Sequence, residues 1–419
     1  MSYFEIIGGR KLHGDINIHG AKNSVLPLLA AVYLCNGTSI LHNCPKLSDV
    51  DASLEILQHL GCSVKREGSV VSVTSSNSPL SEIPEHLMQQ MRSSIVFMGA
   101  MIAKTKKAVL SLPGGCELGP RPIDIHIDSM KRLGVKVECE GGKLLCSAEN
   151  GIFGNNIHLK FPSVGATENI ILTASVADGT TVIYNAAKEP EIADLAVFLN
   201  KAGAKVRGFG TDTIIIEGVP KLNSAEHTVM PDRIVAATCL FAVAGCGGKL
   251  RINNPKPEQL IPILSCLNEC GCDCHYENGS LCLISSGRIH NFDTVTTQPY
   301  PGFPTDAGPL AVAMSIVGKG TAVFIENIFD NRFRYIDELK RFGANIKTVG
   351  RVAVIPGVAH LSGAEVYPHD LRGGAALTLA AMEAYGKSYI KNIDFIDRGY
   401  ENIENIFSSL GADIKRIQE

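Results

Sequence analysis

The stretch Leu60-Gly61-Cys62-Ser63-Val64 recurs in similar form five more times along the chain, and this repeat decides the fold. Each copy places a glycine directly after an apolar residue and three residues before a further apolar one. The glycines stand at Gly61, Gly134, Gly203, Gly271, Gly343 and Gly411. Such self-similarity at a fixed period indicates a chain built from repeated structural units, here six of about 70 residues.

Each glycine is preceded by an amphipathic helical pattern, as in Ile192–Lys201 and Ile403–Leu410, so it is a natural residue just past a helix C-terminus. A strand is expected after the glycine, and a buried apolar helix, such as Val25–Leu34 or Ala375–Ala381, begins each unit. Between the two helices each unit has a short strand pattern, at Thr38–Leu41, Ala108–Leu112, Thr180–Ile183, Lys249–Ile252, Thr321–Phe324 and Ser388–Lys391. The predicted fold class is therefore α/β, with units of helix, strand, helix and strand.

Six units divide most simply into two domains of three units. The segment Thr228–Pro231 opens the fourth unit and is the natural crossing point. Strand patterns before Lys22 have no unit of their own ahead of them, so we expect them to complete the sheet of the last domain. The predicted domains are residues 22–229, and residues 1–21 with 230–419. A cleft between two such halves could close on a substrate.

Composition excludes several classes of function. The 419 residues contain 39 Lys and Arg against 42 Asp and Glu, and there is no basic stripe, so nucleic acid is not an expected partner. No run approaches 18 apolar residues and residues 1–9 do not resemble a signal peptide, so we expect a cytoplasmic protein without membrane insertion. The odd count of 13 cysteines indicates reduced thiols.

The only dense cysteine cluster is Cys270, Cys272 and Cys274. Its period of two suits one face of a strand, whereas a zinc site usually shows cysteine pairs separated by two residues. We therefore predict no metal site there.

The loop Leu112–His126 offers a thiol, a cation and a carboxylate within nine residues, at Cys116, Arg121 and Asp124. Glycines and prolines around Cys116 predict irregular structure in which the thiol can meet solvent or a ligand. Arg121 would favour both the thiolate and an anionic ligand. The alternative is that Cys116 is a small apolar residue like most cysteines.

The first helix of every unit opens with polar or glycine residues at comparable points. Ser163, Asp232 and Thr305 are expected to be ordinary N-caps. A cation at a helix N-terminus opposes the helix dipole, so Lys22, Arg92 and Arg372 indicate a ligand with negative charge. Arg121, Arg332 and Arg398 occupy equivalent later loops and suit a phosphate or carboxylate clamp, or alternatively surface ion pairs.

Motifs in order along almost the whole chain resemble the UDP-N-acetylglucosamine enolpyruvyl transferase family. They are Gly20–Ser24, Gly115–Asp124, Ser163–Asn169, Met230–Ile234, Pro301–Asp306, Asn331–Phe333, Asp370–Gly374 and Asp397–Tyr400. The resemblance implies two inside-out α/β barrel domains. It also implies transfer of enolpyruvyl from phosphoenolpyruvate to UDP-N-acetylglucosamine with release of phosphate, the first committed step of peptidoglycan synthesis. It implies no metal or organic cofactor.

The resemblance also assigns roles to residues. Cys116 matches the family's acid and its target for the epoxide fosfomycin, and Asp306 matches the residue that takes the proton of the sugar 3-hydroxyl. Phosphoenolpyruvate is expected on Lys22, Asn23, Arg121, Arg372 and Arg398, with Arg332 assisting. UDP-N-acetylglucosamine is expected on Asn23, Arg92, Arg121, Pro122, Ile123, Asp124, Ser163, Val164, Gly165, Asp306 and Ile328.

This chain departs from the family pattern at three places. Many members have Glu followed by a small residue at the positions of Val235 and Ala236. Many have Gln directly after the equivalent of Asp306, where this chain has Ala307-Gly308-Pro309. Members often have His at the position of Tyr335. These changes keep open a second hypothesis, a catalytically weak or regulatory UDP-sugar-binding paralogue. A third is enolpyruvyl transfer to a non-nucleotide acceptor such as shikimate phosphate.

Overall fold

The computed structural model describes residues 2–111 and 123–418, without the side chain of Arg92. The predicted site residues Cys116, Arg121 and Pro122 lie outside the described residues. Contacts divide the chain into two compact units. The terminal unit contains the chain up to Ile18 and from Pro231 onward, and the middle unit contains the described residues between His19 and Met230.

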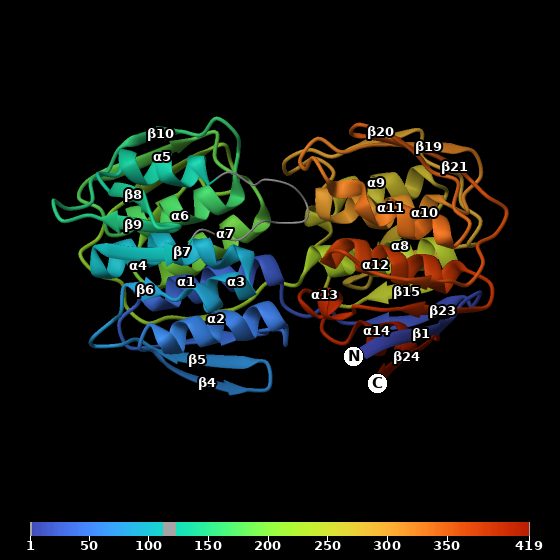
Figure 1. Cartoon of the computed structure of the whole chain (residues 1–419), viewed down its shortest axis with the longest axis horizontal. Coiled ribbons are helices and arrows are strands. Elements are labelled where there is room, and N and C mark those ends of the chain that lie inside the picture. Colours follow the sequence, from blue (N-terminus) through green and yellow to red (C-terminus); the bar gives the residue numbers. More distant parts are fainter. Residues whose placement is uncertain (1, 112–122, 419) are drawn as a thin grey trace. The chain divides into compact units, whose positions relative to one another are not determined.

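The middle unit consists of three four-stranded sheets and the helices they cover (Figure 1). The sheets have the strand orders β14-β3-β5-β4, β6-β7-β9-β8 and β10-β11-β13-β12. Its elements are α1 (Lys22–Leu34), β3 (Thr38–His42), α2 (Ser48–His59), β4 (Ser63–Glu67), β5 (Val70–Thr74), β6 (Glu82–Ile83), α3 (Glu85–Gln90), the 3₁₀ helix η1 (Arg92–Val96), α4 (Phe97–Thr105), β7 (Lys107–Ser111), α5 (Asp124–Arg132), β8 (Lys136–Glu140), β9 (Lys143–Ser147), β10 (Asn156–His158), α6 (Val164–Ala174), β11 (Thr180–Tyr184), α7 (Pro190–Lys201), β12 (Lys205–Arg207), β13 (Thr213–Glu217) and β14 (Glu226–Thr228).

The terminal unit repeats this plan with the orders β16-β17-β15-β2, β18-β19-β21-β20 and β22-β23-β1-β24. Its elements are β1 (Ser2–Ile7), β2 (Leu12–Ile16), α8 (Arg233–Cys246), β15 (Gly248–Ile252), η2 (Pro257–Gln259), α9 (Ile261–Glu269), β16 (Asp273–Glu277), β17 (Ser280–Ser285), β18 (Thr294–Thr296), η3 (Thr305–Ala307), α10 (Gly308–Ser315), β19 (Thr321–Ile325), η4 (Arg332–Arg334), α11 (Tyr335–Arg341), β20 (Lys347–Val349), β21 (Val352–Pro356), β22 (Glu365–Val366), α12 (Leu371–Glu383), β23 (Lys387–Ile390), α13 (Asp394–Asp397), α14 (Ile403–Ser409) and β24 (Asp413–Gln418).

All six sheets share one pairing pattern. One edge strand is parallel to its neighbour, and the other two neighbouring pairs are antiparallel. In one of them β10 runs parallel to β11, with Ile157 opposite Ile183. Strand β13 is antiparallel to both β11 and β12, and Ile216 lies opposite Thr181 on one side and Val206 on the other. The predicted repeat is therefore a repeat of structure as well as of sequence.

The helices form the inside of each unit and the sheets form the outside. Every residue of α1 except Asn23 is buried, and every residue of α8 except Cys246. A helix that is apolar on all sides must be covered on all sides. The sheets cover them with one face, because buried and more exposed residues alternate along strands such as β11. This arrangement confirms the predicted inside-out α/β barrels.

Strands from the two ends of the chain close the sheets of the terminal unit. Strand β1 lies between β23 and β24, with Phe4 opposite Ile390 and Arg416. Strand β2 runs parallel to β15, so it joins the fourth repeat, whereas β1 joins the last. The expectation that the strands before Lys22 complete sheets in the second half of the chain is confirmed.

The six glycines of the repeat share one backbone conformation, with φ between 86° at Gly271 and 100° at Gly203. Gly203 donates its N–H to the carbonyl of Asn200, and Ala204 donates to that of Leu199, at 3.0 and 2.9 Å. These two bonds define the Schellman ending of a helix, in which glycine is favoured because a side chain is strained at positive φ.

The same ending corrects the prediction for the cysteine cluster. Cys270 is the C-cap of α9 and Cys272 follows Gly271 in the helix ending, so only Cys274 belongs to strand β16. The period of two therefore does not mark one strand face. Sequence reasoning failed here because the spacing spans a helix end, a turn and a strand start.

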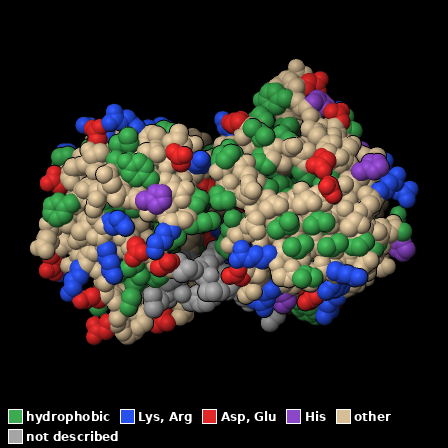
Figure 2. Space-filling view, turned by 90° about the horizontal axis from the view of Figure 1, so that it is seen from above, with side chains coloured by type: hydrophobic (Ala, Val, Ile, Leu, Met, Phe, Trp, Pro, Cys, Tyr) green, Lys and Arg blue, Asp and Glu red, His purple; other side chains and the backbone are tan. Residues whose placement is uncertain are grey.

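The described surface is mixed in charge. On the face shown in Figure 2, Lys and Arg side chains lie among Asp and Glu side chains on both units. Among the described residues, no helix combines the length and the apolar character needed to cross a membrane.

Candidate active site

The helices that open the repeats begin at the predicted positions. Lys22 is the first residue of α1, Arg92 is the first residue of η1, and Arg372 lies in the first turn of α12. Ser163 and Asp232 cap α6 and α8 with their side chains, as expected. The same expectation is wrong for Thr305, because Pro304 stands at the N-cap position of η3.

In the middle unit, Lys22 is held by a buried ion pair. Its Nζ lies 2.7 Å from Oδ2 of Asp49 in α2, and the lysine is only 8% exposed. A carboxylate this close offsets the unfavourable interaction of the lysine with the positive end of α1. Asn23, the next residue, is half-buried. The lysine is thus positioned from two helices before any ligand binds.

Two of the predicted nucleotide-sugar residues, Asp124 and Gly165, lie near His126, which the sequence did not single out as a site residue. Ile123 is the N-cap of α5, which begins at the exposed Asp124. A Cβ at Gly165, in the first turn of α6, would lie 3.1 Å from Cε1 of His126. The ring of His126 therefore packs against the start of α6, and a side chain at position 165 would push the two apart.

His126 is kept neutral by its surroundings. Burial lowers its pKa to about 4, although Asp124 acts in the opposite direction. Nδ2 of Asn169 lies 3.0 Å from Nδ1 of His126 and also donates to the carbonyl of Ile95. Because Asn169 donates here, Nδ1 of the neutral ring is the acceptor and Nε2 carries the proton. Asn169 therefore joins α6, η1 and α5.

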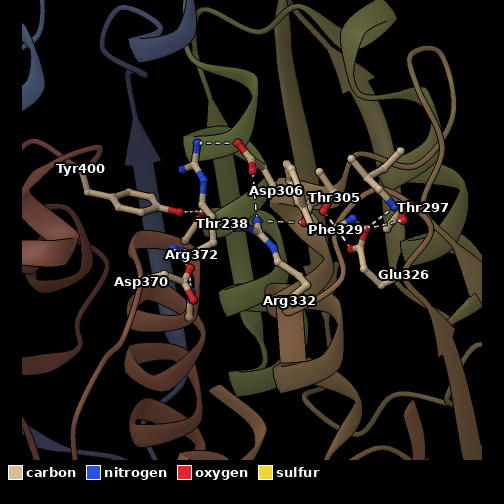
Figure 3. A network of polar contacts seen from close by, with 12 residues as sticks. Thr238, Thr297, Thr305, Asp306, Glu326, Phe329, Arg332, Asp370, Arg372 and Tyr400 are labelled. Carbon is tan, nitrogen blue, oxygen red and sulfur yellow. Dashed lines mark hydrogen bonds and ion pairs between the residues drawn. The ribbon is translucent and has the colours of Figure 1, made fainter. Parts of the chain in front are cut away.

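In the terminal unit, Asp306 lies between two buried arginines (Figure 3). Its Oδ1 is 3.0 Å from Nη2 of Arg332, and its Oδ2 is 3.0 Å from Nη2 of Arg372. The side chains of Arg332 and Arg372 are 2% and 3% exposed, whereas that of Asp306 is 27% exposed. The structure thus brings together three predicted site residues that are up to 66 positions apart in sequence.

Both arginines keep hydrogen-bonding capacity beyond Asp306. Nε of Arg332 and both Nε and Nη1 of Arg372 are buried without a hydrogen-bond partner among the described residues. Burial acts to lower the pKa of Arg372, but Asp306, Tyr400 and Asp232 together outweigh it and hold that pKa above its ordinary value. The guanidinium groups are permanent cations with free donors, which is what an anionic substrate requires.

An aromatic ring supports Arg372. Its guanidinium carbon lies 5.5 Å from the centre of the Tyr400 ring. The Tyr400 hydroxyl is 2.9 Å from Oγ1 of Thr238 in α8, so the ring is fixed in turn. Cation–π contacts of this kind stabilise a buried arginine.

Arg398, the last predicted cation, is half-buried at the C-cap of α13. The preceding residue, Asp397, receives two hydrogen bonds of 2.8 and 2.7 Å from Arg416 in β24. Arg416 also donates to Glu404 at 2.7 Å. The backbone that carries Arg398 is therefore tied to the C-terminal strand.

The departures from the family pattern lie in the packed interior. Val235, Ala236, Ala307 and Tyr335 are all buried. A Cβ at Gly308 would come within 2.6 Å of the Phe324 ring, so this position requires glycine. The departures in α8, α10 and α11 therefore concern residues of the core, whereas Asp306, Arg332 and Arg372 keep the residue types that the family resemblance predicts.

Residue Ile328, expected near the sugar, is half-buried just after β19. Its N–H donates to Oε1 of Glu326 at 2.7 Å. Glu326 is 1% exposed and was missed by the sequence analysis. A charged residue directly after the apolar strand Thr321–Ile325 was the only signal in the sequence that could have found it.

Comparison with known proteins defines the class. Residues 6–407 match the sequence model of EPSP synthase (3-phosphoshikimate 1-carboxyvinyltransferase). The chain also shares its fold with the enolpyruvyl transferase NikO from Streptomyces tendae, with a TM-score of 0.90 at 23% identity, covering 100% and 99% of the two chains. EPSP synthase from Acinetobacter baumannii gives a TM-score of 0.74 at 17% identity over 100% of both chains.

Closer relatives narrow the class. UDP-N-acetylglucosamine 1-carboxyvinyltransferase 2 of Caldanaerobacter subterraneus subsp. tengcongensis is 51% identical over 100% of both chains. The transferase numbered 1 from the same organism is 46% identical over 97% of both, and that of Finegoldia magna is 44% identical over 100% of this chain and 99% of its own. The chain belongs to the EPSP synthase family and, within it, to the UDP-N-acetylglucosamine 1-carboxyvinyltransferases.

Proposed function

We propose that the protein transfers the enolpyruvyl group of phosphoenolpyruvate to the 3-hydroxyl of UDP-N-acetylglucosamine and releases phosphate. This is the first committed step of peptidoglycan synthesis. The observation that carries the proposal is the Asp306 carboxylate held at 3.0 Å by each of two buried arginines that retain free donors. Relatives that carry this activity in their names are 42–51% identical over almost the whole chain.

The reaction proceeds by addition and then elimination. In the addition, Cys116 gives a proton to the methylene carbon, the sugar oxygen bonds to the neighbouring carbon, and Asp306 takes the hydroxyl proton. In the elimination, the Cys116 thiolate left by the addition takes back a proton from the new methyl group, the carbon–carbon double bond re-forms, and the bond from carbon to the phosphate oxygen breaks. Arginines stabilise the leaving phosphate, because fixed cations act most strongly where negative charge develops.

The proposal assigns each substrate to a set of residues. Lys22, Asn23, Arg121, Arg372 and Arg398 would bind phosphoenolpyruvate, with Arg332 assisting. UDP-N-acetylglucosamine would contact Asn23, Arg92, Arg121, Pro122, Ile123, Asp124, Ser163, Val164, Gly165, Asp306 and Ile328. Support comes from the buried ion pair that fixes Lys22 and from the free donors of Arg372.

Domain boundaries and cellular location belong to the same proposal. We propose residues 22–229 as one domain and residues 1–21 with 230–419 as the other. We also propose that the protein works in the cytoplasm. Twelve described cysteines carry free thiols, as is usual in a reducing compartment.

The test is phosphate release by the purified protein. Release should require both phosphoenolpyruvate and UDP-N-acetylglucosamine, and should fall about a hundred- to ten-thousand-fold in Asp306→Asn and Cys116→Ala. Asp273→Asn, at an exposed position of β16, is the matched control and should keep full activity. Release with shikimate 3-phosphate in place of the nucleotide sugar would overturn the choice of acceptor.

A regulatory or catalytically weak paralogue is the second candidate. Two numbered transferases of one organism are both similar to this chain, at 51% and 46% identity, so such proteins occur in pairs. Tight binding of UDP-N-acetylglucosamine by calorimetry without phosphate release would favour this candidate over the active enzyme.

A further inference from the structure

We propose that Glu326 is a positioning residue that sets Asp306 and the Ile328 backbone for the sugar of the nucleotide substrate. This inference rests on the proposed function and goes beyond it to a residue outside the predicted site. Glu326 follows β19 directly and is 1% exposed. A carboxylate in such a place requires compensating hydrogen bonds.

Four donors surround the carboxylate of Glu326 (Figure 3). Oε1 accepts from Oγ1 of Thr297 at 2.9 Å and from the N–H groups of Ile328 and Phe329 at 2.7 and 3.1 Å. Oε2 accepts from Oγ1 of Thr305 at 2.8 Å. All four are hydroxyl or backbone N–H groups, and hydrogen bonds to an ionised acceptor are about twice as strong as those between neutral groups.

These donors come from three separate segments of the chain. Thr297 follows β18, Thr305 begins η3, and Ile328 and Phe329 form the turn after β19. Thr297 also accepts the N–H of Asn327 at 2.8 Å, which closes the network on the same turn. One buried side chain thus fixes the turn that carries Ile328 and the start of the helix that carries Asp306.

Thr305 connects this network to Asp306. Its hydroxyl donates to Glu326, while its carbonyl accepts from Nη2 of Arg332 at 3.1 Å, and the same nitrogen lies 3.0 Å from Oδ1 of Asp306. Arg332 therefore orients Asp306 by contact with its carboxylate, and Glu326 orients Asp306 by holding Thr305, the residue before it. Glu326 fixes Ile328 directly and Asp306 through Thr305, so it acts on two positions expected at the sugar.

Loss of the Glu326 network should impair binding and turnover of the nucleotide sugar more than those of phosphoenolpyruvate. A shift of about 1 Å in a reacting group can reduce a rate about a hundredfold. Replacement of Glu326 by Gln keeps the shape of the side chain. The amide can still accept from Thr297, Ile328 and Phe329, but it must donate to Thr305 instead of accepting. We expect kcat to fall about tenfold to a hundredfold and KM for UDP-N-acetylglucosamine to rise, with KM for phosphoenolpyruvate within about twofold.

The experiment measures steady-state phosphate release for Glu326→Gln, Thr305→Val and Thr297→Val. The matched control is Thr294→Val, which makes the same replacement at an exposed position of β18. Binding of UDP-N-acetylglucosamine is measured by calorimetry on the same samples, and the thermal midpoint is recorded for each. Thr305→Val removes one neutral donor, and Thr297→Val removes one neutral donor together with the acceptor of the Asn327 N–H. Both variants therefore test the network even where Glu326→Gln fails to fold.

The readouts separate the possible outcomes. A raised KM or Kd for the nucleotide sugar at an unchanged KM for phosphoenolpyruvate supports positioning, provided that Thr294→Val behaves as the wild type. The proposal is overturned if kcat/KM falls equally for both substrates and in proportion to a lower thermal midpoint. It is also overturned if all three variants have wild-type kinetics. If the wild-type protein binds the nucleotide sugar without releasing phosphate, the proposed function fails, and the Kd values alone decide the role of Glu326.

Discussion

At the scale of single residues, the site and its surroundings are built from buried or half-buried charges that lie in compensating pairs. Asp306 with its two arginines, Lys22 with Asp49, and Asp397 with Arg416 all place a cation against a carboxylate at 3.0 Å or less. Breaking one partner of a buried pair is costly because the other charge is left uncompensated. His126 is different, because its environment removes the charge instead of pairing it.

The neutral state of His126 predicts a pH dependence of stability. The pKa of a free histidine is about 6.5 and that of His126 is about 4, because burial disfavours the imidazolium. Between these two values the unfolded chain binds a proton that the folded chain does not. The contribution of neutral His126 to the free energy of unfolding is therefore fully present above about pH 6.5. It is lost as the pH falls towards 4, by on the order of 3 kcal/mol.

Urea unfolding at pH 7, 5.5 and 4.5 measures this effect. His126→Gln should flatten the loss of stability over that range, because the titrating group is gone while an acceptor for Asn169 is kept. The control is His158→Gln at an exposed position of β10. An unchanged slope in His126→Gln would show that other groups cause the acid sensitivity.

Thiol reactivity gives a second prediction at this scale. Among the twelve described cysteines only Cys139 is exposed, and burial raises the pKa of most of the others, for example that of Cys146 to about 12. A protonated buried thiol reacts slowly with an epoxide. Fosfomycin should therefore modify Cys116, with the exposed Cys139 as the main competitor among the described thiols. A hydrogen bond with Cys266 lowers the pKa of Cys270, but that thiol is only 1% exposed.

Peptide mass mapping after incubation with fosfomycin and UDP-N-acetylglucosamine tests this order of reactivity. Cys139→Ser should leave the modification at Cys116 unchanged, and Cys116→Ala should abolish it. Preferential labelling of Cys139 in the wild-type protein would contradict the assignment of Cys116 as the reactive thiol.

At the scale of elements, the six helix endings explain why the fold was predictable. Each ending consists of a glycine at positive φ, two Schellman hydrogen bonds and a following strand. These features are local, so a few consecutive residues in each repeat determine them. The first helices were equally visible, since α1 and α12 are apolar on all sides. Local sequence thus specifies both the helix–strand order and the repeat length.

Glycine at these endings can be tested directly. Gly343 has φ of 93° and no atom within 4 Å of an added Cβ, so replacement strains only the backbone. Gly343→Ala should destabilise the terminal unit by roughly 1–2 kcal/mol, the cost of a left-handed alanine. Gly343→Asn should cost less, because asparagine tolerates this conformation.

Urea unfolding midpoints of Gly343→Ala, Gly343→Asn and the wild type measure the difference. Gly357→Ala is not a suitable control because its Cβ would meet a backbone oxygen at 1.7 Å. Lys347→Ala, at an exposed position of β20, controls for a surface change in the same repeat and should lie close to the wild type. Equal midpoints for all variants would mean that the ending contributes nothing to stability.

The part of the site that the sequence did not reveal depends on contacts between distant segments. Glu326 acts on Thr297 and Thr305, which are 29 and 21 residues away, and nothing local marks a buried glutamate as an acceptor for them. Asn169 lies 43 residues from His126. The wrong prediction for Thr305 has the same cause, because its hydroxyl is used by Glu326 instead of by its own helix.

At the scale of the whole molecule, the chain joins its two ends within one sheet. Strand β1 lies between β23 and β24, and Phe4 and Ile6 are completely buried in the core of the terminal unit. The hydrophobic cores of the two units are separate clusters. Each unit therefore contains its own core, and the terminal unit depends on the first residues of the chain.

This division predicts that core damage stays within one unit. Phe4→Ala removes a fully buried ring, which typically costs about 3–5 kcal/mol, and should destabilise the terminal unit alone. Phe198→Ala, an equally buried ring in α7, is the matched substitution in the middle unit. Hydrogen exchange followed by mass spectrometry should show faster exchange in β23 and β24 for the first variant, and in α6 and α7 for the second. Faster exchange throughout the chain in either variant would instead mean that the two units unfold as one, because local damage would then lower the stability of both cores.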